Sequence, residues 1–167
     1  IPELSKSTEA LDLNNWSEQS SPVQVLDRSS NKFNLTLNIT QLCNLHCHYC
    51  AAGGDGTYGD PVRQISVEKT LPQIQMLMKR LKPGGQFNIT FVGGEPLMYP
   101  GAIKAIGLYT LELANQSSIE AEFQIITNGT LINDSVLDLI AVIKPTITIS
   151  IDGPPEINDA QRPQKNG

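Results

Sequence analysis

The residues best suited to chemistry in this sequence are its three cysteines, which lie within eight positions of one another. Cys43, Cys47 and Cys50 form a C-x3-C-x2-C pattern in the segment Gln41–Cys50. Because their number is odd, any intrachain disulfide scheme leaves one thiol unpaired, and no disulfide framework follows. Thiols at such short spacing are typical metal ligands, so the pattern indicates either a zinc site or an iron–sulfur site.

The two metals make different demands on this segment. A structural zinc site has four protein ligands, and His46 or His48 could complete a set with the three thiolates. A four-iron cluster is normally held by four thiolates. Held by only three, it would keep one iron open for chelation by a small molecule.

The composition restricts the setting in which these thiols act. The chain has 167 residues, 40% hydrophobic and 17% charged, which is typical of one globular domain with a sizeable core. Its 12 basic and 17 acidic residues provide no basic surface for nucleic acid or for an anionic membrane. No apolar run approaches the roughly 20 residues of a membrane span, and the start lacks a signal-peptide pattern. With free thiols, these features lead us to expect a cytoplasmic protein.

Alternating strands and helices must position the cysteine segment. Period-2 alternation of apolar and polar residues predicts strands over residues 33–40, 87–92, 121–127 and 146–152. Helical spacing predicts helices from Ser66 or Thr70 to Lys82, from Ala102 to Ala114, and from a cap at 133–134 to Lys144. Pro72 favours the later start of the first helix, or a bend. This order implies βαβ units and a parallel sheet.

Each predicted strand has one apolar and one polar face. Strands that are buried on both faces read instead as continuous apolar runs. We therefore expect the apolar faces to meet the helices and the polar faces to line a wet cavity, as in a wide or incompletely closed barrel. The cysteine segment, Gly93–Pro96, Thr127–Thr130 and Ser150–Pro154 lie at the C-terminal ends of the strands, where βα loops build active sites.

These four segments resemble the motifs of one enzyme superfamily. The cysteine pattern, with Tyr49 before its last Cys, resembles the cluster-binding loop of the radical S-adenosylmethionine (SAM) enzymes. Gly93–Pro96 resembles their GGE element, and the other two segments resemble the ends of their third and fourth strands. The Ser-x-Asp-Gly-Pro stretch followed by residues 158–162 is similar to the branch that contains anaerobic sulfatase maturases and SPASM-type peptide-modifying enzymes.

The resemblance implies the fold and the extent of the domain. The family has an α/β fold, a partial (β/α)6 TIM-like barrel, and about four of its six βα units are recognisable here. We expect residues 33–167 to be the N-terminal part of such a barrel domain, and residues 1–32 to be a polar segment with a short strand at Val23–Leu26. The remaining barrel units and the cysteine-rich C-terminal region of SPASM-type members are not recognisable in the sequence, so either the chain is a fragment, which we expect from its abrupt end at residues 165–167, or the protein departs from its family. We therefore predict that this fragment alone does not turn over substrate, because its sheet edge and cavity wall would be exposed.

The resemblance also implies cofactors and residue roles. Cys43, Cys47 and Cys50 would bind three irons of a [4Fe–4S] cluster and form the catalytic centre, while the fourth iron would be chelated by the amino and carboxylate groups of SAM. Cleavage of SAM would give a 5′-deoxyadenosyl radical that abstracts hydrogen from the substrate. The implied SAM-binding residues are Tyr49 near the adenine, Gly93, Gly94 and Glu95 at the methionine ammonium, Asn128 at the ribose or substrate, and Ser150 with Arg162 at the methionine carboxylate.

Structural alternatives accompany several of these roles. Tyr49 could be a structural aromatic in its loop, Glu95 an exposed loop residue, and Asn128 a turn residue. Asp152 could be either a strand-end cap or a substrate contact. We expect His46 and His48 to be solvated.

The resulting hypothesis is a radical SAM peptide maturase. It would modify a ribosomally synthesised peptide by cross-linking, epimerisation or excision, with a precursor peptide or protein and an electron donor such as a flavodoxin or ferredoxin as partners. One alternative is an anaerobic sulfatase maturase that forms formylglycine from Cys or Ser. Alternatives of another class are a zinc-stabilised peptide-binding module and a barrel that docks peptides without catalysis.

Overall fold

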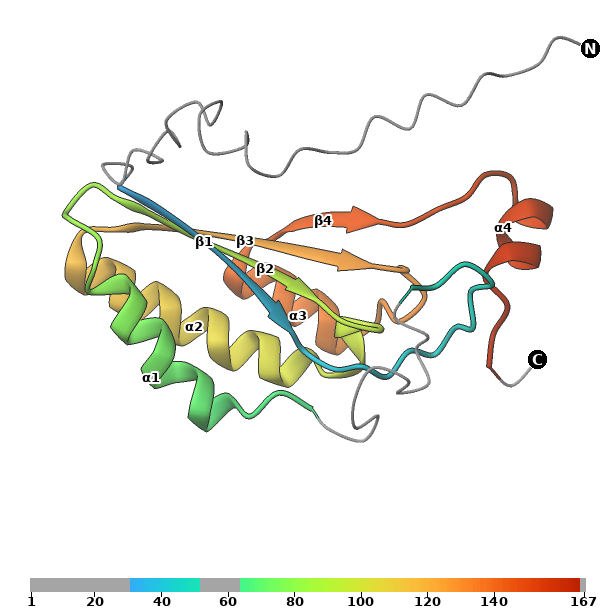
Figure 1. The fold of residues 1–167 in the computed structure, drawn as a ribbon, viewed down its shortest axis with the longest axis horizontal. Coiled ribbons are helices and arrows are strands. Elements are labelled where there is room, and N and C mark those ends of the chain that lie inside the picture. Colours follow the sequence, from blue (N-terminus) through green and yellow to red (C-terminus); the bar gives the residue numbers. More distant parts are fainter. Residues whose placement is uncertain (1–30, 52–63, 166–167) are drawn as a thin grey trace, which may run out of the picture. The chain divides into compact units, whose positions relative to one another are not determined.

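A computed structural model describes residues 31–51 and 64–165 of the chain (Figure 1). The expected strand at Val23–Leu26 and the glycine-rich stretch after the cysteines lie outside these described residues. None of the helices in the described part combines the length and the hydropathy of a membrane span.

Four parallel strands form one sheet in the described residues. They are β1 (Lys32–Asn38), β2 (Gln86–Val92), β3 (Glu120–Thr127) and β4 (Thr146–Ile149), and each pairs with the next in sequence order. The connecting helices are α1 (Val67–Met78), α2 (Pro100–Ser117) and α3 (Asp134–Ile143). A short 3-10 helix, η2 (Pro96–Met98), precedes α2, and α4 (Pro155–Gln161) follows β4. This is the α/β, partial-barrel architecture that the sequence predicted.

The helices cover one face of the sheet. Figure 1 shows α1, α2 and α3 on the same side of the four strands. On β2, Phe87, Ile89 and Phe91 are almost fully buried and join the hydrophobic core, which also contains Ile103 and Ile106 of α2. The polar residues of β1 at 34, 36 and 38 are exposed. The predicted division into an apolar face against helices and a polar face is therefore confirmed.

The element boundaries differ from the predictions in instructive places. Helix α1 starts at the earlier of the two expected positions, with the Ser66 hydroxyl accepting from the Lys69 amide, and Pro72 lies inside it. Because α1 is a surface helix held by its buried face, packing outweighs the hydrogen bond that proline removes. Strand β4 ends at Ile149 rather than at 152, and α4 was not predicted because its seven residues carry no buried side chain to create a periodic pattern.

Candidate active site

A cleft of about 270 Å³ lies at the C-terminal ends of the strands. It is bordered by the cysteine loop, by the ends of β2 and β3, and by the segment that follows β4. All the site residues singled out from the sequence line it, together with three neighbours from the strand ends. The lining residues are Cys43, Cys47, Tyr49, Cys50, Val92, Gly93, Gly94, Glu95, Ile126, Thr127, Asn128, Ser150 and Arg162.

Glycines let the cysteine loop approach the end of β2. The Gly94 amide donates to the Thr40 carbonyl at 2.7 Å, and the Glu95 amide donates to the Leu42 carbonyl at 2.8 Å. A Cβ atom at Gly94 would lie 2.2 Å from the Leu42 oxygen, and one at Gly93 would lie 2.5 Å from the Thr40 oxygen. Glycine is therefore required at both positions, because any side chain would collide with the neighbouring backbone. This close approach sets the position of the start of the cysteine loop.

Glu95 is a buried link between two strand ends. Its side chain has no exposed surface. One carboxylate oxygen accepts from the Leu97 amide at 2.9 Å and from the Thr127 hydroxyl at 2.7 Å, and the other accepts from the Asn128 amide at 2.8 Å. The alternative of an exposed loop residue is therefore wrong. Since a carboxylate offers about four acceptor sites, these three donors leave capacity for one more.

Two asparagines hold the start of the cysteine loop against the end of β3. The Asn128 side-chain amide donates to the Asn44 side-chain oxygen at 2.9 Å, and the Asn44 side-chain amide donates to the Thr130 hydroxyl at 2.8 Å. The Asn128 nitrogen also lies 3.8 Å from the sulfur of Cys43. Sequence reasoning missed Asn44, because a single asparagine in a loop carries no signal of a partner 84 or 86 residues away.

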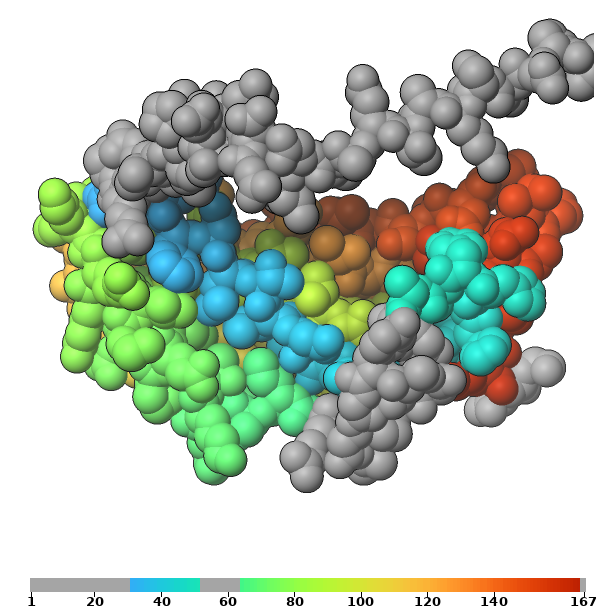
Figure 2. Space-filling model, viewed as in Figure 1, coloured from blue at the N-terminus to red at the C-terminus, as the bar shows by residue number. Residues whose placement is uncertain are grey.

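The chain after α4 returns to the cysteine loop. The His48 amide donates to the Gln161 carbonyl at 3.1 Å, and the His46 amide donates to the Pro163 carbonyl at 2.8 Å. Leu45 and Gln164 form an antiparallel bridge. Figure 2 shows the two segments against each other at one end of the molecule. No pattern in the sequence indicated this pairing, which places Arg162 beside the cysteine loop.

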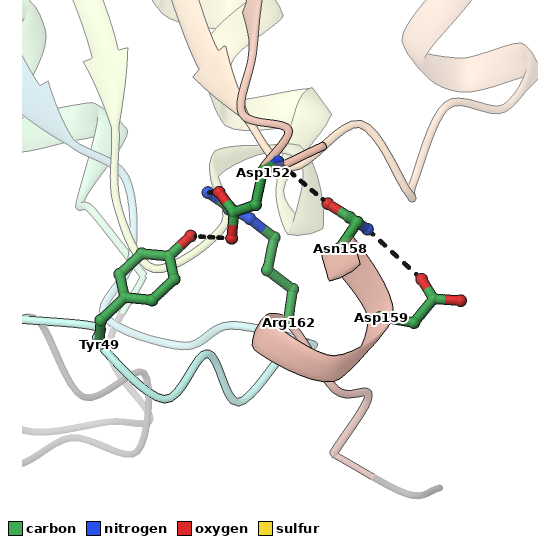
Figure 3. Close-up of polar contacts among 5 residues, drawn as sticks. All are labelled: Tyr49, Asp152, Asn158, Asp159 and Arg162. Atoms are coloured by element: carbon green, nitrogen blue, oxygen red, sulfur yellow. Dashed lines mark hydrogen bonds and ion pairs between the residues drawn. The ribbon is translucent and has the colours of Figure 1, made fainter. Parts of the chain in front are cut away.

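Arg162 is engaged with Asp152 and Tyr49 (Figure 3). Its Nη2 atom donates to Asp152 Oδ1 at 2.9 Å, while the Tyr49 hydroxyl donates to Asp152 Oδ2. The guanidinium carbon lies 5.4 Å from the centroid of the Tyr49 ring, a cation–π distance. Arg162 Nε is buried and has no hydrogen-bond partner among the described residues. A charged guanidinium N–H forms its strongest hydrogen bonds with anions, so a bound anion would satisfy this donor.

The surroundings shift the pKa values of several of these groups. Burial raises the pKa of the Cys43 and Cys47 thiols above its usual value, and for Cys47 the nearby Arg162 charge partly offsets the effect. Both are therefore thiols at neutral pH, and metal binding must displace their protons. Hydrogen bonds from Arg162 and then Tyr49 lower the pKa of Asp152, which keeps it ionised.

The donor set of the cleft fits a four-iron cluster. Cys43, Cys47 and Cys50 are free thiols, and His46 and His48 are exposed. Three thiolates can each bind a different iron of such a cluster, and the fourth iron then takes another ligand. The thiols, together with the unpaired Arg162 donor, fit a cluster with an anionic ligand beside it.

Comparison with known proteins agrees with this donor set. Residues 37–166 match the Radical SAM superfamily. The chain belongs to this superfamily. Its members use a [4Fe–4S] cluster and SAM as cofactors. The matched region includes the cysteine loop, all four strand ends and Arg162.

Relatives within the superfamily have different activities. The chain is 32% identical, over 90% of its length, to the serine-type anaerobic sulfatase-maturating enzyme of Klebsiella aerogenes. It is 27% identical to the sporulation killing factor maturation protein SkfB of Bacillus subtilis over 79% of its length, and to a GTP 3′,8-cyclase of Rhodopirellula baltica over 78%. It covers 37%, 29% and 34% of these three relatives.

A solved structure shares the fold. The structure titled anSMEcpe with bound AdoMet aligns with a TM-score of 0.65 and 22% identity, covering 81% of this chain and 35% of that one. The chain thus spans about a third of the length of these relatives and of this structure.

Proposed function

We propose that this chain is the cofactor-binding part of a radical SAM enzyme that modifies a ribosomally synthesised peptide or a protein. The observation that carries the proposal is the cleft, where three free thiols, the Gly93–Glu95 turn and Arg162 come together from the ends of β1, β2 and β4. The family membership supplies the cofactors, and the cleft supplies the residues to hold them. We expect the protein to work in the cytoplasm, where thiols stay reduced.

The proposed roles follow from the contacts within the cleft. Cys43, Cys47 and Cys50 would each hold one iron, and the buried Nε of Arg162 would donate to the methionine carboxylate of SAM. Glu95, with capacity for one more donor, would accept from the methionine ammonium. When bound, the cofactors supply one-electron cleavage of the SAM sulfonium and an adenosyl radical able to abstract hydrogen from an unactivated carbon.

The remaining proposed contacts involve the strand ends and the loop aromatic. Tyr49 would lie beside the adenine, Ser150 would assist Arg162 at the carboxylate, and Asn128 would face the ribose or the substrate. Gly93 and Gly94 act through the close approach that they permit. The contacts already made by Asn128 with Asn44 and with Cys43 support a role at the cluster rim as well.

The open face of the sheet supports a peptide as substrate. It carries a ladder of amide and hydroxyl groups in which Asn88 donates to Asn34 at 3.0 Å and Gln124 donates to Thr148 at 3.0 Å. Asn88 Oδ1 is buried without a partner among the described residues. Such groups can pair with the backbone amides of an extended peptide. Two of the named relatives are maturation enzymes, which also favours this class over a nucleotide.

A sulfatase maturase that oxidises Cys or Ser to formylglycine is the second candidate. The 32% identity to a serine-type sulfatase-maturating enzyme, over 90% of this chain, specifically favours it. An electron donor such as a flavodoxin or ferredoxin would be needed in either case. Two alternatives involve no catalysis: a zinc-stabilised peptide-binding module, and a barrel that only docks peptides.

Cluster binding can be tested on the isolated chain. We would reconstitute it anaerobically with iron and sulfide, measure both, and record the EPR spectrum of the reduced protein with and without SAM. Wild type should hold about four irons, and SAM should change the spectrum. Cys47→Ala should lose the cluster, whereas the matched loop variant His48→Ala should keep it, because His48 is exposed. Binding of zinc alone, with loss in His48→Ala, would replace the proposal with the zinc module.

Substrate class requires the longer protein that contains this chain. We would assay 5′-deoxyadenosine formation with a reductant, adding a sulfatase-motif peptide, a peptide encoded beside the enzyme, or GTP. Stimulation by the neighbouring peptide, with a mass change in it, supports the peptide maturase. Conversion of the sulfatase motif to formylglycine supports the second candidate. Stimulation by GTP alone would refute both.

A further inference from the structure

We propose that Asp152 is a positioning residue that holds Arg162 and Tyr49 ready for SAM before the cofactor arrives. This inference rests on the proposed function of the cleft and names a residue that the sequence left undecided. Asp152 would not touch SAM. It would act through the two side chains that its carboxylate joins.

The carboxylate of Asp152 divides its two oxygens between two elements. Oδ1 accepts from Arg162, which follows α4, at 2.9 Å, and Oδ2 accepts from the hydroxyl of Tyr49 in the cysteine loop. Figure 3 shows Asp152 between the other two side chains. One carboxylate thus fixes the orientation of both groups, and the cation–π contact at 5.4 Å closes the triangle. We name Tyr49, Asp152 and Arg162 the loop-to-helix triad.

Hydrogen bonds hold the main chain at Asp152 and at Arg162. The Asp152 amide donates to the Asn158 side-chain oxygen at 3.4 Å, and the Arg162 amide donates to the Asn158 carbonyl at 2.8 Å. The main-chain bonds of Gln161 and Pro163 to the cysteine loop flank Arg162 on both sides. Because the backbones are fixed by these bonds, the remaining freedom lies in the long side chain of Arg162, and Asp152 removes it.

The ion pair with Asp152 uses only part of the donor capacity of Arg162. The side chains of Arg162 and Asp152 are only 13% and 21% exposed, so the pair is more shielded than an ordinary surface salt bridge. Guanidinium has five N–H donors, and Asp152 takes one of them at Nη2 while buried Nε stays unpartnered among the described residues. A methionine carboxylate would therefore add to the Asp152 contact without displacing it.

The test is the affinity for SAM of protein that carries the cluster. Equilibrium dialysis with labelled SAM and the unreduced cluster measures binding without turnover. We expect Asp152→Asn to bind SAM about tenfold more weakly, as loss of one charge-assisted contact predicts. Glu156→Gln is the matched control, because Glu156 is an exposed acidic residue in the first turn of α4, and it should bind as wild type does.

A second variant shows whether Asp152 acts through the triad. Tyr49→Phe keeps the ring and removes only the hydroxyl bonded to Asp152, so it should also weaken binding. The double variant should lose less than the product of the two single effects, because both remove the same arrangement. In the longer enzyme, Asp152→Asn should raise the KM for SAM and leave kcat nearly unchanged.

The outcomes separate this inference from the proposal on which it rests. If wild type holds the cluster and does not bind SAM, the proposed function fails. If wild type binds SAM and Asp152→Asn binds equally or more tightly, the positioning role is overturned. If Asp152→Asn does not load iron, the test rests on Tyr49→Phe alone. An affinity for SAM equal to that of wild type in Tyr49→Phe then overturns the positioning role of Asp152.

Discussion

Gly94 provides the sharpest test of how the cysteine loop is placed. In Gly94→Ala the new Cβ would lie 2.2 Å from the carbonyl oxygen of Leu42 and 2.5 Å from its carbon. Ordinary contact begins near 3.4 Å, so the two backbones must separate by about 1 Å. That movement strains the Gly94–Thr40 and Glu95–Leu42 hydrogen bonds, now 2.7 and 2.8 Å. Overpacking plus weakened bonds should cost about 2–4 kcal/mol of unfolding free energy.

Two measurements report on this variant. Urea denaturation of the metal-free protein gives the change in stability, and iron analysis after reconstitution shows whether the loop still holds the cluster. The control is Gly101→Ala in the first turn of α2, where a Cβ meets nothing within 4 Å. That change should be neutral or stabilise by about 0.4–1 kcal/mol. Equal stability and iron content in the two variants would refute the close-contact argument.

Three further predictions concern the same cleft. Asn44→Ala removes both side-chain hydrogen bonds to the end of β3 and should lower the free energy of unfolding in urea by about 1–2 kcal/mol, with faster iron loss to a chelator. Unchanged iron retention would show that these two bonds do not hold the cysteine loop in place. Glu95→Gln replaces one carboxylate oxygen by an NH2 group, which must face at least one of the donors bonded to this buried side chain, and should cost about 1–3 kcal/mol by thermal melting, whereas Glu112→Gln on the surface of α2 should cost almost nothing. Because burial raises the pKa of Cys43 and Cys47, iron loading must displace protons, so loading measured by iron content should rise from pH 7 to pH 9; a flat profile would contradict protonated thiols.

Local patterns in the sequence were enough to predict the scaffold. Period-2 alternation located the strands because a half-buried strand places every second residue in the core. The same alternation predicted which face the helices cover. The C-terminal strand ends then indicated one shared site, since parallel strands present these ends at the same edge. The cysteine spacing restricted the chemistry to metal binding before any fold was known.

Short elements without a buried face escaped this reasoning. Helix α4 has no buried side chain and so no apolar period, and Pro72 argued against residues that α1 includes. In α1, tertiary packing outweighs the local preference against proline. The boundaries that the sequence misplaced are those where packing, capping or a neighbouring segment decides.

Partner choice inside the site was decided only by the tertiary structure. The sequence singled out Glu95 and Arg162 by type and position, yet it could not show that Glu95 is buried under three donors or that Arg162 binds Asp152. Nor could it show that Asn44 meets Asn128. These contacts join segments from 10 to more than 80 residues apart, and side-chain pairing at that range depends on how the strand ends converge. Spacing along the chain fixes which groups reach the cleft, and packing around it fixes which of them touch.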